Sequence, residues 1–477
     1  MTITSLNFAV FVAIVLIVYY LLPLKWQNVW LLLVSYVFYF NFGLRVTSVL
    51  VIMTLANYIF AKSIFKSGKR RTLLLWVGIG FNLSALAFFK YSDFFLPPVL
   101  DRLSALGIDI ERGFFGYLLP ILLPAGLSFL VLQTISYLID VYRDQMPAST
   151  SLVDFALYLA YFPKLLSGPI ERARSFLPKL AKPRIVDNGL LERSFVLIII
   201  GLARKLVIAD PLASMIPEEV LKNPSSYDAI SLLGYLLAFA FSLYNDFAGY
   251  TNIMRGVSGL FGIELSPNFQ RPYFAKNVAE FWNRWHITLS HWLRDYIYYP
   301  INRALKKRIR SRNNLITFIV PPLVTMVASG LWHGASWNMV FWGTFHGVFL
   351  ALERLPQLWR PMTTYQNQPR WRKVISRFSV FIVVLFAWIP FQMDLAASWD
   401  YISSMFTWSY WALPDLRIIT VIAGSIILDW LQERSKDEVI FLRWPLAARA
   451  SILALAILAI FFVSQADLSF TFVYQGF

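Results

Sequence analysis

The chain has 477 residues, of which 58% are hydrophobic, 17% aromatic and 15% charged. A soluble domain carries about 25% charged residues, so this composition excludes an ordinary water-soluble protein and indicates a single membrane domain over 1–477. The formal net charge of +16 lies in short loops between apolar runs, which favours a membrane protein and argues against binding to nucleic acid.

Apolar runs suited to transmembrane helices follow one another along the chain. Because a spanning helix needs about 20 apolar residues, they predict an all-α, polytopic helical bundle with about 11 to 12 spans. The first run lacks the basic start and cleavage site of a signal peptide, so we expect it to be retained. The candidate spans are residues 6–24, 28–44, 46–62, 72–90, 119–142, 194–210, 228–245, 315–332, 337–353, 374–391, 417–431 and 448–466.

One apolar segment, 152–170, is too interrupted for an ordinary span. It contains Pro163, Lys164, Gly168 and Pro169. We expect this segment to be re-entrant, which requires neighbouring protein or water to satisfy its backbone polar groups.

The charges of the loops predict which side of the membrane each loop faces. Basic side chains without acidic ones fill 62–71 and 301–314, and more basic residues follow in 354–377. These loops should be cytoplasmic, because Lys and Arg accumulate on that side of a membrane. The segment 91–113 is acidic on balance and 392–416 has no Lys or Arg, so both should face outward.

A polar and aromatic stretch from Tyr244 to Asp295 interrupts the succession of apolar runs. It is too polar to face lipid and too aromatic for an ordinary loop. Within it, the spacing of apolar residues predicts one continuous helix over 279–296. Glu280 and Arg284 stand four residues apart, in the order that favours an ion pair on a helix. A neighbouring face of this predicted helix carries Trp282, His286 and Ser290.

The histidines are confined to one region of the chain. There are four of them: His286, His291, His333 and His346. Three interpretations are open for ionisable groups at membrane depth: a hydrogen bond between helices, a metal site, or acid–base chemistry near neutral pH. No metal is expected, because no suitable His or carboxylate spacing supports one. The chain has no cysteine, which excludes thiolate ligands and a cysteine acyl-enzyme. Gly330 and Gly334 beside His333 should permit close backbone approach.

Several motifs together point to one family. The stretches RWHITLSHWLRDYIYYP and SGLWHGASWNMVFWGTFHG resemble the membrane-bound O-acyltransferase family, above all its bacterial branch that acetylates alginate and related polysaccharides. Proteins of teichoic-acid D-alanylation are nearer relatives on this basis than the eukaryotic lipid enzymes. The resemblance covers most of 1–350, thins over 355–465, and makes 244–350 the catalytic motif region. Further agreement lies in 123–144, 161–173 and 245–273.

The resemblance implies a fold and a pair of functional residues. It implies a helical bundle with re-entrant helices and a central catalytic tunnel. His333, in the WHG motif, is then the main catalytic residue, and His286 is its partner. Thr288 stands where the family often has Ser, a change that keeps the hydroxyl group. Because the two histidines are far apart in sequence, tertiary packing has to bring them together.

The resemblance also implies a reaction. An acyl thioester, taken to be acetyl-CoA, reaches the enzyme from the cytoplasm as donor substrate, and no cofactor is bound permanently. We hypothesise that His333 acts as general base on an acceptor hydroxyl, while His286 orients the acceptor or stabilises charge. Side-chain or backbone donors would stabilise the oxyanion. The residues expected to contact the substrates are Trp332, Trp282, Asn245, Asp246, Arg284, Ser290, Asp295 and Gln133.

The tail 467–477 carries Phe472, Tyr474 and Phe477 in an F-x-Y-x-x-F arrangement. This resembles the C-terminal motif of the small partner peptide in teichoic-acid D-alanylation, where a tyrosine hydroxyl is thought to carry the acyl group. We hypothesise that Tyr474 accepts the acyl group and presents it outward to sugar or to a periplasmic SGNH-type acetyltransferase. The alternative is an aromatic tail that packs on the helical bundle.

Two other functions compete with acyl transfer. The resemblance implies an enzyme of the bacterial cytoplasmic (inner) membrane that acts towards an extracytoplasmic polysaccharide. A transporter or flippase of a polysaccharide or lipid precursor is the alternative, with Asp140 and Asp246 as its best coupling carboxylates, although both fall in family motifs. A noncatalytic scaffold would leave the clustering of histidines unexplained. The acceptor and the acyl group stay open at this point.

Overall fold

The computed structural model describes residues 2–106, 124–184, 186–309, 314–358, 369–407 and 413–464. Within these ranges every regular element is a helix, which confirms the predicted all-α class. The chain divides into two compact units. The first comprises Met1–Leu191 and Val257–Ser266, and the second comprises Glu192–Gly256 and Pro267–Phe477. The prediction of a single domain over the whole length stays a prediction.

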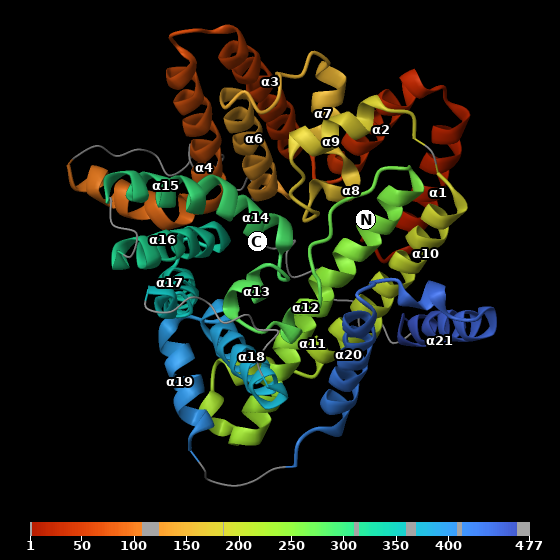
Figure 1. The fold of residues 1–477 in the computed structure, drawn as a ribbon, viewed down its shortest axis with the longest axis vertical. Coiled ribbons are helices and arrows are strands. Elements are labelled where there is room, and N and C mark those ends of the chain that lie inside the picture. Colours follow the sequence, from red (N-terminus) through yellow and green to blue (C-terminus); the bar gives the residue numbers. More distant parts are fainter. Residues whose placement is uncertain are drawn as a thin grey trace. The chain divides into compact units, whose positions relative to one another are not determined.

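The first unit is built from the N-terminal helices (Figure 1). Helix α6 packs against both α3 and α4, and α2 packs against α7. Their bounds are α1 (Leu6–Leu21), α2 (Leu24–Phe40), α3 (Leu44–Lys66), α4 (Arg71–Ala105), α6 (Leu127–Tyr142), α7 (Leu152–Ala160), α8 (Phe162–Leu165) and α9 (Ala173–Ala181).

The predicted interruption in 152–170 is present in the structure. Helix α7 ends before Tyr161, and the single turn of α8 follows it with Pro163 inside. Every residue of 155–170 is buried by the surrounding protein. That burial provides the protein neighbours which an interrupted segment needs at membrane depth, while its re-entrant path stays a prediction.

The second unit contains the remaining helices and the whole of the region 267–350 that carries the histidines (Figure 1). Helix α10 begins at the end of the first unit, and the last residues of α12 belong to that unit. The bounds are α10 (Asn188–Leu202), η1 (Ala203–Ala209), α11 (Asp210–Ser214), η2 (Glu218–Leu221), η3 (Pro224–Ser226), α12 (Ala229–Leu260), η4 (Pro272–Phe274), α13 (Val278–Trp282), α14 (Ile287–Leu293), η5 (Arg294–Tyr298), α15 (Tyr299–Arg308), α16 (Leu315–His333), α17 (Trp337–Leu352), η6 (Leu355–Leu358), α18 (Arg370–Gln392), α19 (Leu395–Met405), α20 (Leu416–Ser435), η8 (Ile440–Arg443) and α21 (Leu446–Ser464).

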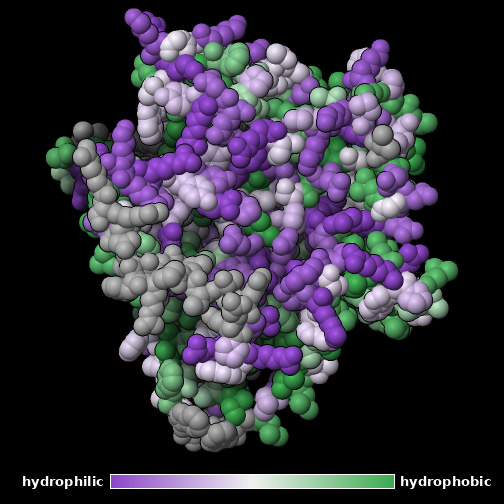
Figure 2. All heavy atoms as spheres, viewed as in Figure 1, coloured by the Kyte–Doolittle hydropathy of each residue, from purple (hydrophilic) through white to green (hydrophobic). Residues whose placement is uncertain are grey.

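The helices have the length and composition of membrane spans. Among the described residues, 6 helices are long and apolar enough to cross a membrane, and α1 and α6 are shorter apolar helices. Every predicted span overlaps a helix of the structure. The most apolar stretch, Leu446–Val463 of α21, has no buried residue within the protein, and green, hydrophobic side chains reach the surface around it in Figure 2. The chain is a multi-pass membrane protein whose exposed apolar side chains suit contact with lipid.

The predicted continuous helix over 279–296 is wrong. Helix α13 ends at Trp282, α14 begins at Ile287, and the backbone turns sharply between them at His286, whose φ is 41°. Hydrogen bonds from a distant segment cause the break. The amide of Gln270 donates to the carbonyl of Arg284 at 2.9 Å, and the amide of Ile287 donates to the carbonyl of Asn268 at 2.9 Å. These bonds replace the helical ladder around His286.

Helices α16 and α17 form a closely packed hairpin (Figure 1). A Cβ added at Gly330 would lie 2.1 Å from the carbonyl oxygen of Met339, and one added at Gly343 would lie 2.3 Å from that of Met326. Only glycine fits at these two contacts, as in other close helix pairs of membrane proteins. Gly330 therefore permits the predicted close approach, whereas at Gly334 an added Cβ would meet side-chain atoms alone, of Met339 at 3.3 Å and Ser336 at 3.7 Å. The hairpin fixes His333 at the end of α16.

Candidate active site

The two predicted catalytic histidines share a neighbour. His333 is the last residue of α16, and His286 immediately precedes α14; both are buried, with 4% and 1% of their surfaces exposed. The indole of Trp332 lies edge-on to both imidazoles, with ring centroids 4.8 Å from His333 and 6.1 Å from His286. The fold therefore brings together two rings that the sequence separates.

A third histidine extends this group. The indole of Trp342 lies 5.3 Å from the ring of His333 and 4.9 Å from that of His346. Trp282 contacts His346 at 5.0 Å and Trp342 at 5.7 Å between ring centroids. The histidine cluster, defined here as His286, Trp332, His333, Trp342, His346 and Trp282, thus alternates imidazoles and indoles.

Several polar atoms of the histidine cluster are buried away from water. Within the described part of the chain, both ring nitrogens of His346 lack a hydrogen-bond partner in the protein. The indole N–H groups of Trp282 and Trp342 lack one as well. Buried polar groups are normally satisfied, so such a concentration is characteristic of a site that binds a polar ligand. Sequence reasoning did not assign His346 or Trp342 to the site. The W-x-x-x-H spacing of Trp342 and His346 was the available signal.

Helix α18 closes one side of the histidine cluster. The ring of Phe391 lies 5.2 Å from His333 and 5.4 Å from Trp342. The side-chain amide of Asn338, at the start of α17, donates to the carbonyl of Pro390 at 3.0 Å. These contacts hold α18 against the hairpin and keep the imidazole of His333 in an aromatic environment.

His286 is neutral at physiological pH. Burial lowers the pKa of its imidazole to about 3, because the charged form would lose its hydration. A neutral imidazole carries one N–H donor and one acceptor nitrogen. His286 can therefore orient a hydroxyl or stabilise a developing charge by hydrogen bonding without itself being a cation.

A cavity of about 320 Å³ adjoins the histidine cluster through Trp282. It lies among α13, α14, η5, α16 and α17, and two predicted substrate contacts, Trp282 and Ser290, line it. Because the chain breaks at His286, Trp282 and Ser290 belong to two separate helices and not to one helix face. The hydroxyl of Ser290 donates to the carbonyl of Trp285 at 3.0 Å. The lining is otherwise largely apolar, as is typical of a small-molecule site.

Two arginines give this cavity a positive side. Arg294 and Arg354 both line it; the guanidinium carbon of Arg354 lies 5.0 Å from the Tyr298 ring centre and that of Arg294 lies 5.9 Å from Tyr299. Asp295, another predicted contact, pairs with Arg294 at 3.2 Å. Sequence reasoning missed both arginines, although Arg354 directly follows a predicted span and opens a basic stretch. Guanidinium groups of this kind bind phosphates and other anions.

Asn245 and Asp246 lie on α12 and not in a loop. The side chain of Asn245 accepts from Arg204 at 2.8 Å, and the carboxylate of Asp246 pairs with Lys205 at 2.7 Å. Lys205 also pairs with Asp210 at 2.8 Å, and all these side chains are buried. Charged groups at this depth need such partners. Contact of Asn245 and Asp246 with substrate stays a prediction.

The other predicted contacts are dispersed. Arg284 pairs with Glu280 at 2.7 Å, as predicted, and also with Glu433 at 3.0 Å. Gln133 belongs to the first unit, where its side-chain carbonyl accepts from the fully buried amine of Lys164. Tyr474 lies outside the described residues. In the described ranges no three His, Asp or Glu side chains converge as metal ligands.

A buried histidine cluster next to a cavity, inside a bundle of membrane helices, is the arrangement of a membrane enzyme. Residues 31–393 match the family model of MBOAT, the membrane-bound O-acyltransferase family. The chain belongs to this family and is an O-acyltransferase. The match includes the whole histidine cluster and the cavity, whereas α20 and α21 lie beyond it. It excludes the transporter and scaffold interpretations.

Curated relatives make the class more specific. The chain is 33% identical over 413 residues to "Probable alginate O-acetylase AlgI" of Azotobacter vinelandii, covering 85% of this chain and 78% of that protein. It is 31% identical over 356 residues to the peptidoglycan O-acetyltransferase of Helicobacter pylori, covering 69% and 64%. It is 28% identical over 291 residues to the teichoic acid D-alanyltransferase of Streptococcus thermophilus, covering 57% and 69%.

Proposed function

We propose that this protein transfers an acetyl group from acetyl-CoA on the cytoplasmic side of the bacterial inner membrane towards hydroxyls of an extracytoplasmic polysaccharide. Two relatives carry names of polysaccharide or cell-wall O-acetyltransferases, which supports an acetyl group and a sugar acceptor. The observation that carries the proposal is the pair of buried histidines, His286 and His333, which both contact the indole of Trp332.

The chemical step assigns one role to each histidine. A nitrogen of His333 removes the proton from the acceptor hydroxyl, whose oxygen attacks the thioester carbonyl carbon. The carbon–sulfur bond then breaks, an ester forms, and the leaving thiolate takes the proton from the imidazolium of His333. Neutral His286 orients the acceptor by hydrogen bonding. The indole N–H groups of Trp282 and Trp342 are the candidate donors to the oxyanion.

The cavity is the candidate entry site for the donor. Arg354 and Arg294 suit the phosphates of coenzyme A, and the predicted cytoplasmic stretch 354–377 begins at the cavity wall. Met326 lines the cavity, and His333 is seven residues further along α16, or about 10 Å at 1.5 Å per residue. An extended thioester arm spans that distance, which brings its carbonyl towards the histidine cluster.

Tyr474 is the proposed acyl relay. Its hydroxyl would lose a proton to His333, form an ester with the acetyl group and release the thiol of coenzyme A. A sugar hydroxyl, or a periplasmic SGNH-type acetyltransferase, would then take the acetyl group and regenerate the tyrosine. The F-x-Y-x-x-F arrangement supports this proposal, as does the D-alanyltransferase among the relatives.

The test uses purified full-length protein with acetyl-CoA labelled in its acetyl group and an alginate oligosaccharide. We expect release of thiol, transfer of label to sugar, and label on the protein when sugar is omitted. Tyr474→Phe removes only the hydroxyl and should abolish the protein-bound label and reduce transfer at least about 100-fold. Phe472→Tyr, which adds a hydroxyl nearby, is the control. Full activity of Tyr474→Phe would dismiss the relay, and no thiol release from wild type would dismiss the donor.

A further inference from the structure

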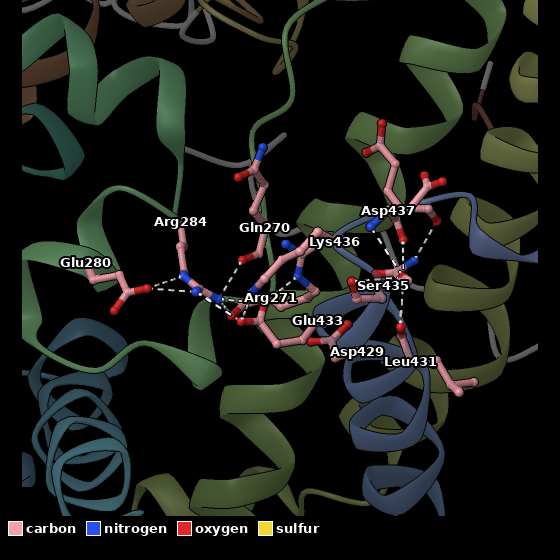
Figure 3. A network of polar contacts seen from close by, with 12 residues as sticks. Gln270, Arg271, Glu280, Arg284, Asp429, Leu431, Glu433, Ser435, Lys436 and Asp437 are labelled. Carbon is pink, nitrogen blue, oxygen red and sulfur yellow. Dashed lines mark hydrogen bonds and ion pairs between the residues drawn. The ribbon is translucent and has the colours of Figure 1, made fainter. Parts of the chain in front are cut away.

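The carboxylate of Glu433, near the end of α20, contacts several positively charged side chains (Figure 3). It accepts from Nε of Arg271 at 2.9 Å, from Nη1 and Nη2 of Arg284 at 3.0 and 3.2 Å, and from the amine of Lys436 at 2.5 Å. Glu433 is 9% exposed and both arginine side chains are largely buried, whereas the side chain of Lys436 is exposed. Such charge-assisted bonds are strong and directional.

The two arginines belong to two backbone segments that face each other. Arg284 also reaches across to the carbonyl of Arg271 through Nη1 at 3.3 Å, and it is held from its own side by Glu280. The amide of Gln270 donates to the carbonyl of Arg284 at 2.9 Å. Glu433 therefore joins the segments 268–271 and 284–288 at one point.

His286 lies inside the frame that these two segments form. The residues on its C-terminal side are fixed by Asn268, whose carbonyl accepts from the amide of Ile287 at 2.9 Å and whose side chain accepts from the hydroxyl of Thr288 at 2.6 Å. His286 itself has φ 41°, and Arg271 has φ 50°. A non-glycine residue adopts such a conformation only when its surroundings impose it.

We propose that Glu433 is a positioning residue for His286: it holds Arg271 and Arg284 together and thereby maintains the left-handed turn that presents the imidazole to Trp332. Without the carboxylate, two guanidinium groups would face each other with their shared counter-charge removed, and repulsion would separate the two segments. The effect on acetyl transfer rests on the proposed function of His286, whereas the effect on its backbone does not. Glu433 belongs to α20, which lies beyond the residues 31–393 that match the family model.

Glu438 provides a matched control in the same part of the chain. Its carboxylate accepts from Nη1 and Nη2 of Arg255 at 2.7 and 2.8 Å and from Arg193 at 2.5 Å. Like Glu433 it pairs with two arginines, but these belong to α12 and α10. Glu438→Gln therefore removes a comparable ion-pair group without touching the segments around His286.

The first measurement compares the geometry of His286 in Glu433→Gln and Glu438→Gln. Purified proteins in detergent are treated with diethyl pyrocarbonate, and modification of each histidine is measured by mass spectrometry of peptides. Buried His346, which the network does not contact, is the internal reference. We expect modification of His286 to rise at least about fivefold relative to His346 in Glu433→Gln only, because the turn opens. Equal protection in both variants would overturn the proposal.

The second measurement asks whether Glu433 acts through His286. We expect Glu433→Gln to lower kcat about 10- to 100-fold while the KM for acetyl-CoA changes less than about twofold, and Glu438→Gln to leave both near wild type. In a His286→Ala background, Glu433→Gln should cause no further loss, because residues that act as one unit are not additive. A further loss as large as in wild type would assign Glu433 a separate, structural role.

The outcomes separate this proposal from the proposed function. Wild-type activity of His286→Ala would reject the catalytic role of His286, while the modification data would still decide whether Glu433 holds its turn. Should Glu433→Gln fail to fold, Glu433→Asp keeps the charge but shortens the side chain by one methylene. We expect intermediate modification of His286 and an intermediate kcat in that variant. Full protection of His286 in Glu433→Asp, with wild-type kcat, would contradict the proposal.

Discussion

At the scale of single residues, Trp332 contacts both of the histidines that the sequence separates. Its indole lies 4.8 Å from the ring of His333 and 6.1 Å from that of His286, in a region with little exposed surface. Edge-to-face contacts of this kind fix ring orientation as well as burying area. The contact with Trp332 therefore constrains the orientation of both imidazoles.

Replacement of Trp332 by Phe should reduce kcat about tenfold while protein yield and melting temperature stay close to wild type. Phenylalanine keeps an aromatic ring but is smaller and has no N–H. The aromatic contact that both imidazoles make with this residue is therefore weakened. The measurement is thiol release from acetyl-CoA by purified protein. Trp337→Phe is the control, because Trp337 begins the next helix and is 73% exposed. Equal activity of both variants would dismiss this role of Trp332.

At the scale of elements, the hairpin of α16 and α17 carries most of the histidine cluster. Gly330 and Gly343 bring the two backbones together, so that His333 of α16 contacts Trp342 of α17, which also contacts His346. In membrane proteins small residues at such contacts replace the hydrophobic driving force that water would supply. The geometry of the site thus depends on backbone contact as well as on its own side chains.

We expect Gly343→Ala to destabilise the folded protein by about 1–3 kcal/mol, because the new methyl group would collide with backbone that cannot move aside. Thermal unfolding in detergent, followed by tryptophan fluorescence, should show a lower Tm together with reduced activity. Gly424→Ala in α20 is the control, since a Cβ there meets nothing within 4 Å. Its Tm should stay the same or rise slightly, as alanine favours helix. Equal Tm values for the two variants would show that the hairpin is not closely packed.

The sequence predicted the elements better than it predicted the site. Apolar runs placed α16 at 315–332 and α18 at 374–391, close to their observed bounds, because lipid imposes a helix on any long apolar segment. The break at His286 was missed, because it depends on hydrogen bonds from Asn268 and Gln270, which no local spacing reveals. Arg354 was missed because a cavity is formed by elements distant in sequence.

At the scale of the whole molecule, the proposed transfer requires a donor and an acceptor on opposite sides of a membrane. Long apolar helices alternate with basic loops, and the cavity opens beside one of these basic stretches at Arg354. The basic loops of any inner-membrane protein attract anions in a general way. The proposed donor site differs from such loops in that its arginines line a cavity next to the histidine cluster.

Arg354→Gln should raise the KM for acetyl-CoA about tenfold and leave kcat nearly unchanged, because a phosphate contact binds ground and transition states alike. Arg372→Gln tests the general effect of a basic loop, since Arg372 is exposed in the same stretch and does not line the cavity. Steady-state kinetics of thiol release provide both constants. If the two substitutions raise KM equally, the cavity has no specific role in donor binding.

Acetyl transfer by His333→Ala, with His291→Ala as control, decides whether the histidine cluster performs the chemistry. His291 lies on α14 and outside the histidine cluster. We expect His333→Ala to insert into the membrane normally but to lose at least about 1000-fold in the rate of thiol release, within the range attributed to a general base, and His291→Ala to retain most of its activity. Undiminished turnover by His333→Ala would contradict the account.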